Sequence, residues 1–187
     1  NVVYTYSWNL NGTSSGLTGS TVAYTSTNRG ELWEVEVTAC DQDLANPLCG
    51  SAGLASVSIE NGLPSITDCN ISPPTPYTTD DLVATGANWS DADGDTEQYL
   101  YEWYIDTGSG YVSAGISTSS LTSSLTAKGY DIMAECTPID SFGSGTTVAS
   151  NPVTIQNSPP SLSSCELFDT SPDSDADLAV IIGAWTD

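Results

Sequence analysis

The chain has 187 residues, with 24 acidic side chains against two basic ones and no histidine, so its formal net charge is −22 at pH 7. A surface this acidic repels phosphate, which makes nucleic acids and anionic membranes poor partners. Without histidine the chain lacks a Ser-His-Asp triad, a Cys-His pair and an imidazole metal site. We therefore predict that it is not an enzyme and has no catalytic residues. No apolar run approaches the roughly 20 residues that a membrane helix needs, so we expect no membrane insertion in this segment.

Alternating apolar and polar residues predict β-strands along the chain, beginning with residues 4–10 and 32–39. Residues 99–105 and 131–137 repeat the same alternation. The side chains on the predicted inner faces are Tyr4, Tyr6, Trp8 and Leu10, then Trp33, Val35, Val37 and Ala39, then Tyr99, Tyr101, Trp103 and Ile105, and finally Ile132, Ala134 and Cys136. Glycine-containing turns fall at residues 11–12, 93–95, 108–110 and 143–145. No helical periodicity interrupts them, so the predicted fold class is all-β with antiparallel strands.

An internal repeat of about 96 residues organises the chain. Residues 58–69 correspond to residues 154–165, and the correspondence continues without a gap to residues 91 and 187. In the other direction, residues 4–8 correspond to residues 99–103, and residues 30–41 to residues 129–140. We predict the C-terminal part of one repeat at residues 1–60, a complete repeat at residues 61–156 and the N-terminal part of a further repeat at residues 157–187. Such a chain is expected to be part of a longer tandem array.

Each repeat is expected to form an aligned β-sandwich of about seven short strands. Within the repeat, a proline-rich joint is followed by Tyr-Thr-Thr-Asp-Asp-Leu (77–82), Trp-Ser-Asp-Ala-Asp-Gly-Asp (89–95) and the aromatic strand 99–104. This arrangement resembles the immunoglobulin-like repeats of large bacterial or archaeal surface proteins, and it is also similar to polycystic-kidney-disease-type repeats. After the tryptophan strand, residues 104–108 depart from the polycystic-kidney-disease pattern, so the broader immunoglobulin-like family is the better match. The resemblance implies modules found in adhesins, surface fibres and the non-catalytic parts of secreted enzymes.

The five cysteines indicate an oxidising, extracellular compartment. Cys136 lies on the inner face of its predicted strand and Cys69 lies near the start of the same repeat, so we predict a Cys69–Cys136 disulfide across the core. Cys40 and Cys49 flank a predicted loop and form a second expected pair. Cys165 corresponds to Cys69 and is expected to be unpaired within this chain. The alternative is that all five are reduced, buried cysteines.

The best candidate for a metal site is the acidic turn of residues 91–95. The carboxylates of Asp91, Asp93 and Asp95 alternate around Gly94, and Glu97 offers a further oxygen, so the four residues are candidate ligands for Ca²⁺. The spacing differs from that of an EF-hand loop. An acidic turn that is simply solvated is an equally good interpretation. No other cofactor is expected.

Three Asn-x-Ser/Thr sequons, at Asn11, Asn70 and Asn88, are candidate glycosylation sites. Asn11 lies in a predicted turn and is the most accessible, whereas Asn88 precedes a predicted core tryptophan.

Short joints that contain proline, at residues 59–64 and 155–160, limit the freedom between neighbouring repeats. We therefore expect a non-catalytic structural segment of an extracellular filament or a large cell-surface adhesin, acting as a semi-rigid shaft stapled by disulfides. Its expected partners are further copies of the repeat in the same chain and identical chains in a filament, joined through edge strands. The alternative is a carbohydrate-binding or spacer module of a secreted multidomain hydrolase.

Overall fold

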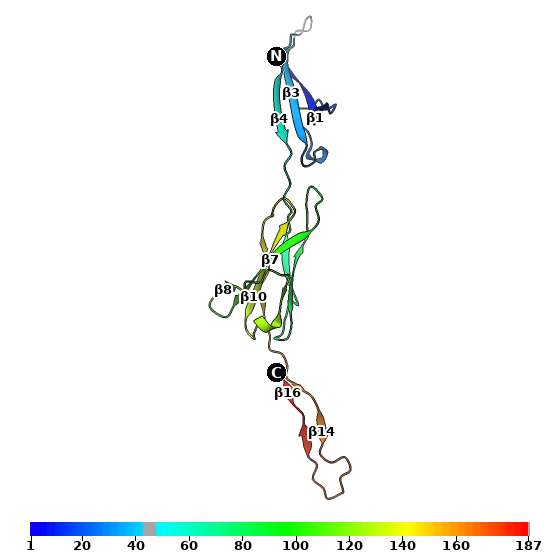
Figure 1. The fold of residues 1–187 in the computed structure, drawn as a ribbon, viewed down its shortest axis with the longest axis vertical. Helices are drawn as coiled ribbons and strands as arrows, with labels where there is room; N and C mark the ends of the chain where they lie inside the picture. Colours follow the sequence, from blue (N-terminus) through cyan, green and yellow to red (C-terminus); the bar gives the residue numbers. More distant parts are fainter. Residues whose placement is uncertain (43–47, 187) are drawn as a thin grey trace. The chain divides into compact units, whose positions relative to one another are not determined.

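The structure, a computed structural model, describes residues 1–42 and 48–186. The strands in this part of the chain pair antiparallel, and the helical elements described are the two single-turn 3-10 helices η1 (Tyr24–Ser26) and η2 (Ser123–Leu125) (Figure 1). The predicted all-β fold class is therefore confirmed. None of the described helices has the length and apolar character needed to cross a membrane.

The described residues fall into two compact units. The first unit contains the described residues 1–42 and 48–65 together with two later loops, residues 89–98 and 139–145. The second unit contains the described residues 66–88, 99–138 and 146–186.

The first unit is built on a sheet with the strand order β2-β1-β3-β4. Its strands are β1 (Val2–Leu10), β2 (Thr13–Ser14), β3 (Leu32–Asp41) and β4 (Gly53–Ser58). Asn11 and Gly12 both have positive φ, at 50° and 76°, which suits the tight turn between β1 and β2. In the register of β1 with β3, Trp8 pairs with Val35 and Tyr6 with Val37, so the predicted apolar residues share one face.

The second unit contains a sandwich of two sheets. One sheet has the order β5-β6-β9 and the other the order β11-β10-β7-β8, with β12 also paired to β10. The strands are β5 (Asp68–Ser72), β6 (Leu82–Ala87), β7 (Gln98–Asp106), β8 (Tyr111–Ser113), β9 (Ser120–Leu121), β10 (Asp131–Ile139), β11 (Val148–Ala149) and β12 (Val153–Thr154). This is the sheet order of an immunoglobulin-like sandwich.

The predicted repeat of about seven strands contains eight, because its last strand is divided into β11 and β12. Between them, Ser150 turns its side chain inward and accepts a hydrogen bond from the backbone of Ala134 at 3.0 Å. Pro152 follows and has no N–H to donate to the sheet. The ladder to β10 is therefore interrupted at this point.

The core of the sandwich consists of apolar side chains from both sheets. Trp103, Leu82 and Leu121 have no exposed surface, and the side chains of β10 alternate between buried and half-buried. The Trp103 ring nitrogen donates a hydrogen bond to the carbonyl of Thr118 at 2.9 Å, so its burial leaves no donor unpaired. The period-two pattern of the sequence thus places this tryptophan between the layers.

Two disulfides are present in the described residues. Cys69 of β5 and Cys136 of β10 are bonded with an S–S distance of 2.03 Å, and this bond links the two sheets. Cys40 and Cys49 are bonded at 2.02 Å at the base of a loop whose residues 43–47 lie outside the described part of the chain. Cys165 is free and exposed.

The C-terminal residues of the second unit form a hairpin of β13 (Ser161–Leu162), β14 (Cys165–Leu167), β15 (Val180–Ile182) and β16 (Trp185–Thr186). Strand β13 pairs with β16, and β14 pairs with β15. In this hairpin Cys165 faces Ile182 and Leu167 faces Val180, a register that repeats the pairing of Cys69 with Gly86 and Ile71 with Ala84.

The two disulfides close chain segments of very different length, with sequence separations of 67 and 9 residues. We predict that replacing Cys69 and Cys136 by alanine lowers the free energy of unfolding by about 4 kcal/mol. Replacing Cys40 and Cys49 by alanine is expected to lower it by about 2.5 kcal/mol. The first loss is larger because closing a longer loop removes more entropy from the unfolded chain. Urea unfolding followed by tryptophan fluorescence measures both. Equal losses for the two pairs would contradict this account.

Candidate functional site

The acidic turn that the sequence singles out lies between β6 and β7. Asp91 organises it, because its Oδ1 accepts hydrogen bonds from the backbone N–H groups of Asp93 at 2.9 Å and Asp95 at 3.0 Å. Gly94 supplies the positive φ, 74°, on which this tight loop depends. The other oxygen of Asp91, Oδ2, is buried and has no hydrogen-bond partner within the described residues.

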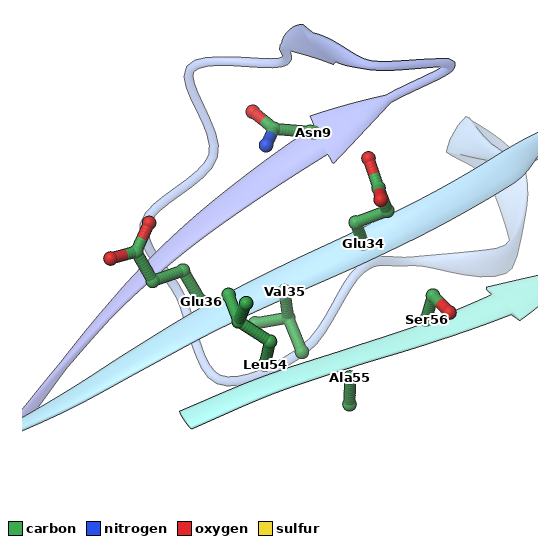
Figure 2. Close-up of a pocket in the computed structure, with 7 residues that line it drawn as sticks. All are labelled: Asn9, Glu34, Val35, Glu36, Leu54, Ala55 and Ser56. Atoms are coloured by element: carbon green, nitrogen blue, oxygen red, sulfur yellow. The ribbon is translucent and has the colours of Figure 1, made fainter. Parts of the chain in front are cut away.

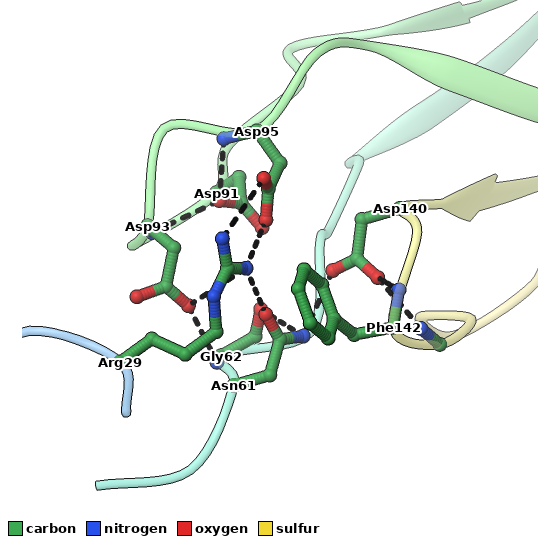
Figure 3. Close-up of polar contacts among 9 residues, drawn as sticks. Arg29, Asn61, Gly62, Asp91, Asp93, Asp95, Asp140 and Phe142 are labelled. Atoms are coloured by element: carbon green, nitrogen blue, oxygen red, sulfur yellow. Dashed lines mark hydrogen bonds and ion pairs between the residues drawn. The ribbon is translucent and has the colours of Figure 1, made fainter. Parts of the chain in front are cut away.

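Arg29 closes the turn (Figure 3). It lies just before β3, and its guanidinium donates to both carboxylate oxygens of Asp95, including a hydrogen bond from Nη2 to Oδ1 at 3.2 Å. The same guanidinium is 3.9 Å from Asp93 Oδ2 and donates to the side-chain carbonyl of Asn61. It also stacks on the ring of Phe142, with 3.9 Å from Cζ to the ring centroid. One of the chain's two basic residues therefore binds two carboxylates, an amide and an aromatic ring.

Asn61 and Gly62 connect this network to the loop after β10. Asn61 Nδ2 donates to Asp140 Oδ2 at 2.9 Å, while the backbone N–H of Gly62 donates to Asp93 Oδ2 at 2.8 Å. Asp140 Oδ1 in turn accepts from the backbone N–H groups of Phe142 and Gly143, each at 2.6 Å. The hydrogen bond from Asn61, with smaller contributions from these backbone donors and from Arg29, holds the pKa of Asp140 below its ordinary value.

All of these residues belong to the first compact unit, although the sequence assigns them to different repeats. Arg29 precedes the predicted boundary at residue 60, and the other contacting side chains follow it. Leu63, in the predicted joint, packs against Gly143 so closely that a Cβ added there would lie 2.7 Å from Leu63 Cδ2. Residues 61–63 are therefore held within the first unit by charge, hydrogen bonds and packing together.

The predicted metal ligands divide into two groups in the structure. Carboxylate oxygens of Asp91, Asp95 and Asp140 lie within 4.8 Å of one another. Asp93 is turned toward Arg29 and Gly62 instead, and Glu97 is not in the group. Sequence reasoning missed Asp140 and Arg29, because each comes from a loop remote in the chain. Asp140 and Asp41 occupy equivalent positions in the internal repeat. This equivalence can be seen in the sequence, but it does not indicate that Asp140 belongs to a metal site.

The three sequon asparagines are exposed and occupy different settings. Asn11 lies in the β1–β2 turn, where its Oδ1 accepts from the backbone of Leu32 at 2.9 Å. Asn70 is in β5. Asn88 has a positive φ of 58°, and its Nδ2 donates to Thr67 Oγ1 at 2.7 Å, so the nitrogen that a glycan would modify is engaged in a hydrogen bond.

A shallow groove of about 340 Å³ lies on the polar face of the first sheet (Figure 2). Figure 2 shows Asn9, Glu34, Glu36 and Ser56 along this face, whereas Ala55 points to the other side of the sheet. Leu54 is its large exposed apolar side chain, and none of the described residues that line it is aromatic. The groove offers carboxylate, amide and hydroxyl groups but no stacking platform.

The sequence matches no protein-family model and no curated protein. Among solved structures, domains A168–A170 of titin are similar with 13% identity and a TM-score of 0.38, over 84% of this chain and 59% of that one. The FN1–FN3 domains of chicken CNTN1 are similar with 11% identity and a TM-score of 0.36, over 96% of this chain and 64% of that one. The chain thus spans less than two thirds of either structure.

The hydrogen bonds that lower the pKa of Asp140 predict that its contribution to stability depends on pH. A carboxyl whose pKa is depressed by folding contributes stability that is present above its unfolded value, near 3.8, and is lost as the pH falls through the folded value. We predict that Asp140→Asn lowers the melting temperature at pH 7 and that its difference from the unchanged chain shrinks as the pH falls below about 4. Melting followed by circular dichroism from pH 3 to pH 7 measures this. A difference independent of pH would show that the charge of Asp140 contributes nothing.

Proposed function

We propose that the chain is a non-catalytic structural segment of an extracellular filament or a large cell-surface adhesin, in which it acts as a semi-rigid shaft. The observation that carries the proposal is the Arg29 network, which binds the predicted joint at Asn61 and Gly62 to the loops at residues 91–95 and 140–143. This linker is short, contains the fully buried Pro64 and is hydrogen-bonded on both sides, which supports a stiff joint over a flexible tether. Stiff joints between repeats are what a shaft requires.

The charge balance gives this network its importance, because the side-chain ion pairs found among the described residues are those of Arg29. With 24 acidic side chains and two basic ones, neighbouring acidic loops repel one another unless a cation lies between them. Arg29 supplies that cation, and its planar guanidinium binds carboxylates in a fixed orientation, which a lysine would not do. The position of a single side chain therefore converts a repulsive contact into an attractive one.

The extracellular setting is supported by the two disulfides, because such bonds persist in oxidising environments. The inter-sheet Cys69–Cys136 bond also suits a mechanical role. Pulling on the ends of the chain cannot extend the residues between those two cysteines while the bond is intact.

The alternative is a carbohydrate-binding or spacer module of a secreted hydrolase, and the groove on the polar face of the first sheet is the observation that favours it. Its carboxylate, amide and hydroxyl groups can donate to and accept from sugar hydroxyls. Against this, Trp33 and Trp103 are buried and therefore cannot stack on a sugar from solution. A glycan array probed with the chain, with Glu36→Ala as the groove variant, distinguishes the two functions.

We predict that Arg29→Gln loosens the joint. Nitroxide labels at Thr5→Cys and Thr85→Cys, in a Cys165→Ser background, give a distance distribution by pulsed electron paramagnetic resonance. The distribution is expected to be narrow in the unchanged chain and clearly broader in Arg29→Gln, because the acidic loops then repel. Lys128→Gln, which removes the other cation, is the matched control and should leave the width unchanged. A broad distribution before any substitution would refute the semi-rigid shaft.

We further propose that Ca²⁺ binds the acidic turn, with Asp91, Asp95 and Asp140 in place of the set expected from sequence. The proposal is supported by their close carboxylate oxygens and by the buried, unpartnered Oδ2 of Asp91. We predict that millimolar CaCl₂ raises the melting temperature by several degrees relative to EDTA, and that Asp91→Asn abolishes the shift. Equal melting temperatures in CaCl₂ and EDTA would leave Arg29 as the cation that neutralises this turn.

A further inference from the structure

The sheet of the first unit has an apolar face that the described residues cover only in part. The register places Tyr6, Trp8, Val35, Val37 and Val57 on this face, opposite the polar face that carries Glu34 and Glu36. Trp8 contacts Trp33 edge to face, with 6.3 Å between ring centroids, but Val57 is 56% exposed. An apolar hollow of about 190 Å³, lined by Trp8, Trp33, Val35, Ala55, Ser56 and Val57, lies on this side. In its apolar composition, this face is like the inner face of a sheet in a β-sandwich.

The corresponding face in the second unit is buried at its centre. The repeat places Trp103, Ala134 and Cys136 where the first sheet has Trp8, Val35 and Val37, and none of these three counterparts has any exposed surface. Their cover is the β5–β6 hairpin, whose Cys69, Ile71, Leu82 and Ala84 are all buried. Within the molecule, therefore, a hairpin of this kind already packs on a face of this kind.

The C-terminal hairpin is a second copy of that cover, and its apolar side chains are exposed within the described residues. Cys165, Leu167, Leu178 and Val180 correspond to the four buried residues of the β5–β6 hairpin, and the pairing register is the same. Yet Leu167 is 49% exposed and Val180 is 57% exposed. The described residues thus hold an uncovered sheet and an unused cover, each complementary to the other by the internal repeat.

We propose that the apolar face of β1, β3 and β4 is a docking surface for the hairpin of residues 161–186 from a second copy of this chain. The two pieces together form one immunoglobulin-like sandwich, built on the pattern of residues 61–156. Because the two surfaces are different, each copy can donate a hairpin and accept another, and the contact propagates head to tail into an open assembly. This deepens the proposed structural role, on which it rests, by naming the partner of the shaft.

One position distinguishes this contact from the interior that it copies. In the second unit Cys69 is bonded to Cys136, and their Cα atoms are 5.6 Å apart. In the assembled sandwich Cys165 takes the place of Cys69, but Val37 takes the place of Cys136. The contact between copies is therefore non-covalent and leaves the Cys165 thiol facing a valine. Both partners are acidic, so salt that screens their repulsion strengthens the association.

Restoring the missing cysteine tests the proposal. Val37→Cys in the full chain places a second thiol where a disulfide with Cys165 satisfies the required Cα separation. Under mild oxidation with glutathione disulfide, this variant is expected to give a ladder of disulfide-linked oligomers on a non-reducing gel. Glu36→Cys, one residue away on the polar face of β3, is the matched control and should give no ladder. Cys165→Ser added to Val37→Cys should abolish it.

Sedimentation velocity tests the non-covalent contact without any new cysteine. Val180→Asp places a charge in the proposed contact and is expected to weaken association by roughly tenfold or more. Ile181→Asp, on the opposite face of β15, adds the same charge and should have little effect. Association that grows with protein and NaCl concentration supports the proposal.

Two results would overturn it. A Val37→Cys chain that remains monomeric but loses both thiols would show that its own hairpin occupies the face. Free thiols that persist under oxidation, together with a monomer at all concentrations, would show that a second copy does not bind. Neither result affects the spin-label test of the joint, so the failure of this contact and the failure of the shaft are distinguishable.

Discussion

A β-sheet with one apolar face must bury that face against a second layer, and this requirement governs the whole molecule. The alternation of Tyr, Trp and Val with Glu, Ser and Thr makes every long strand two-sided. Where both layers are present, as around Trp103, the side chain is wholly buried and its ring nitrogen is hydrogen-bonded. Where one layer stands alone, as around Val57 or Val180, the same pattern leaves apolar side chains in water. Complete and incomplete sandwiches therefore differ in what covers the sheet. The alternation of apolar and polar residues in their strands is the same.

The second constraint is electrostatic. An acidic chain gains solubility from its charge, but the same charge opposes any close approach of its own loops. At the joint this conflict is resolved by one guanidinium, which also gains a stacking contact with Phe142. Hydrogen bonds from Asn61 and from backbone N–H groups to Asp140 and Asp93 distribute the remaining charge over neutral donors. A few residues, each with several partners, therefore make the polar contacts at the joint.

Much of the fold follows from the sequence, because strand periodicity and the internal repeat are local or directly comparable signals. The inner positions of β3 and β10, the Asn-Gly turn and the sheet pairings around Trp8 and Trp103 all depend on such signals. The division of the last strand at Ser150 and Pro152 was not anticipated, since it depends on a side chain that bonds to the backbone of a neighbouring strand. The membership of the acidic cluster was also beyond reach. Asp140 and Arg29 lie near Asp95 because of the paths of their loops, and those paths are set by the folded sheets. The prediction of Glu97 came from alternation along the loop. Alternation within a loop does not determine which way a side chain points.

The scarcity of basic residues has a further consequence, for the durability of the chain. A protease of trypsin-like specificity cleaves after lysine or arginine, and in 187 residues it finds two such bonds, after Arg29 and after Lys128. At the first of these, the guanidinium that the enzyme would need to take into its own acidic pocket is already bound to Asp95, Asn61 and the Phe142 ring. The side chain that holds the joint together is therefore also withheld from digestion. Lys128, by contrast, is exposed, so the composition that gives the protein its charge leaves such an enzyme one accessible bond in the folded chain.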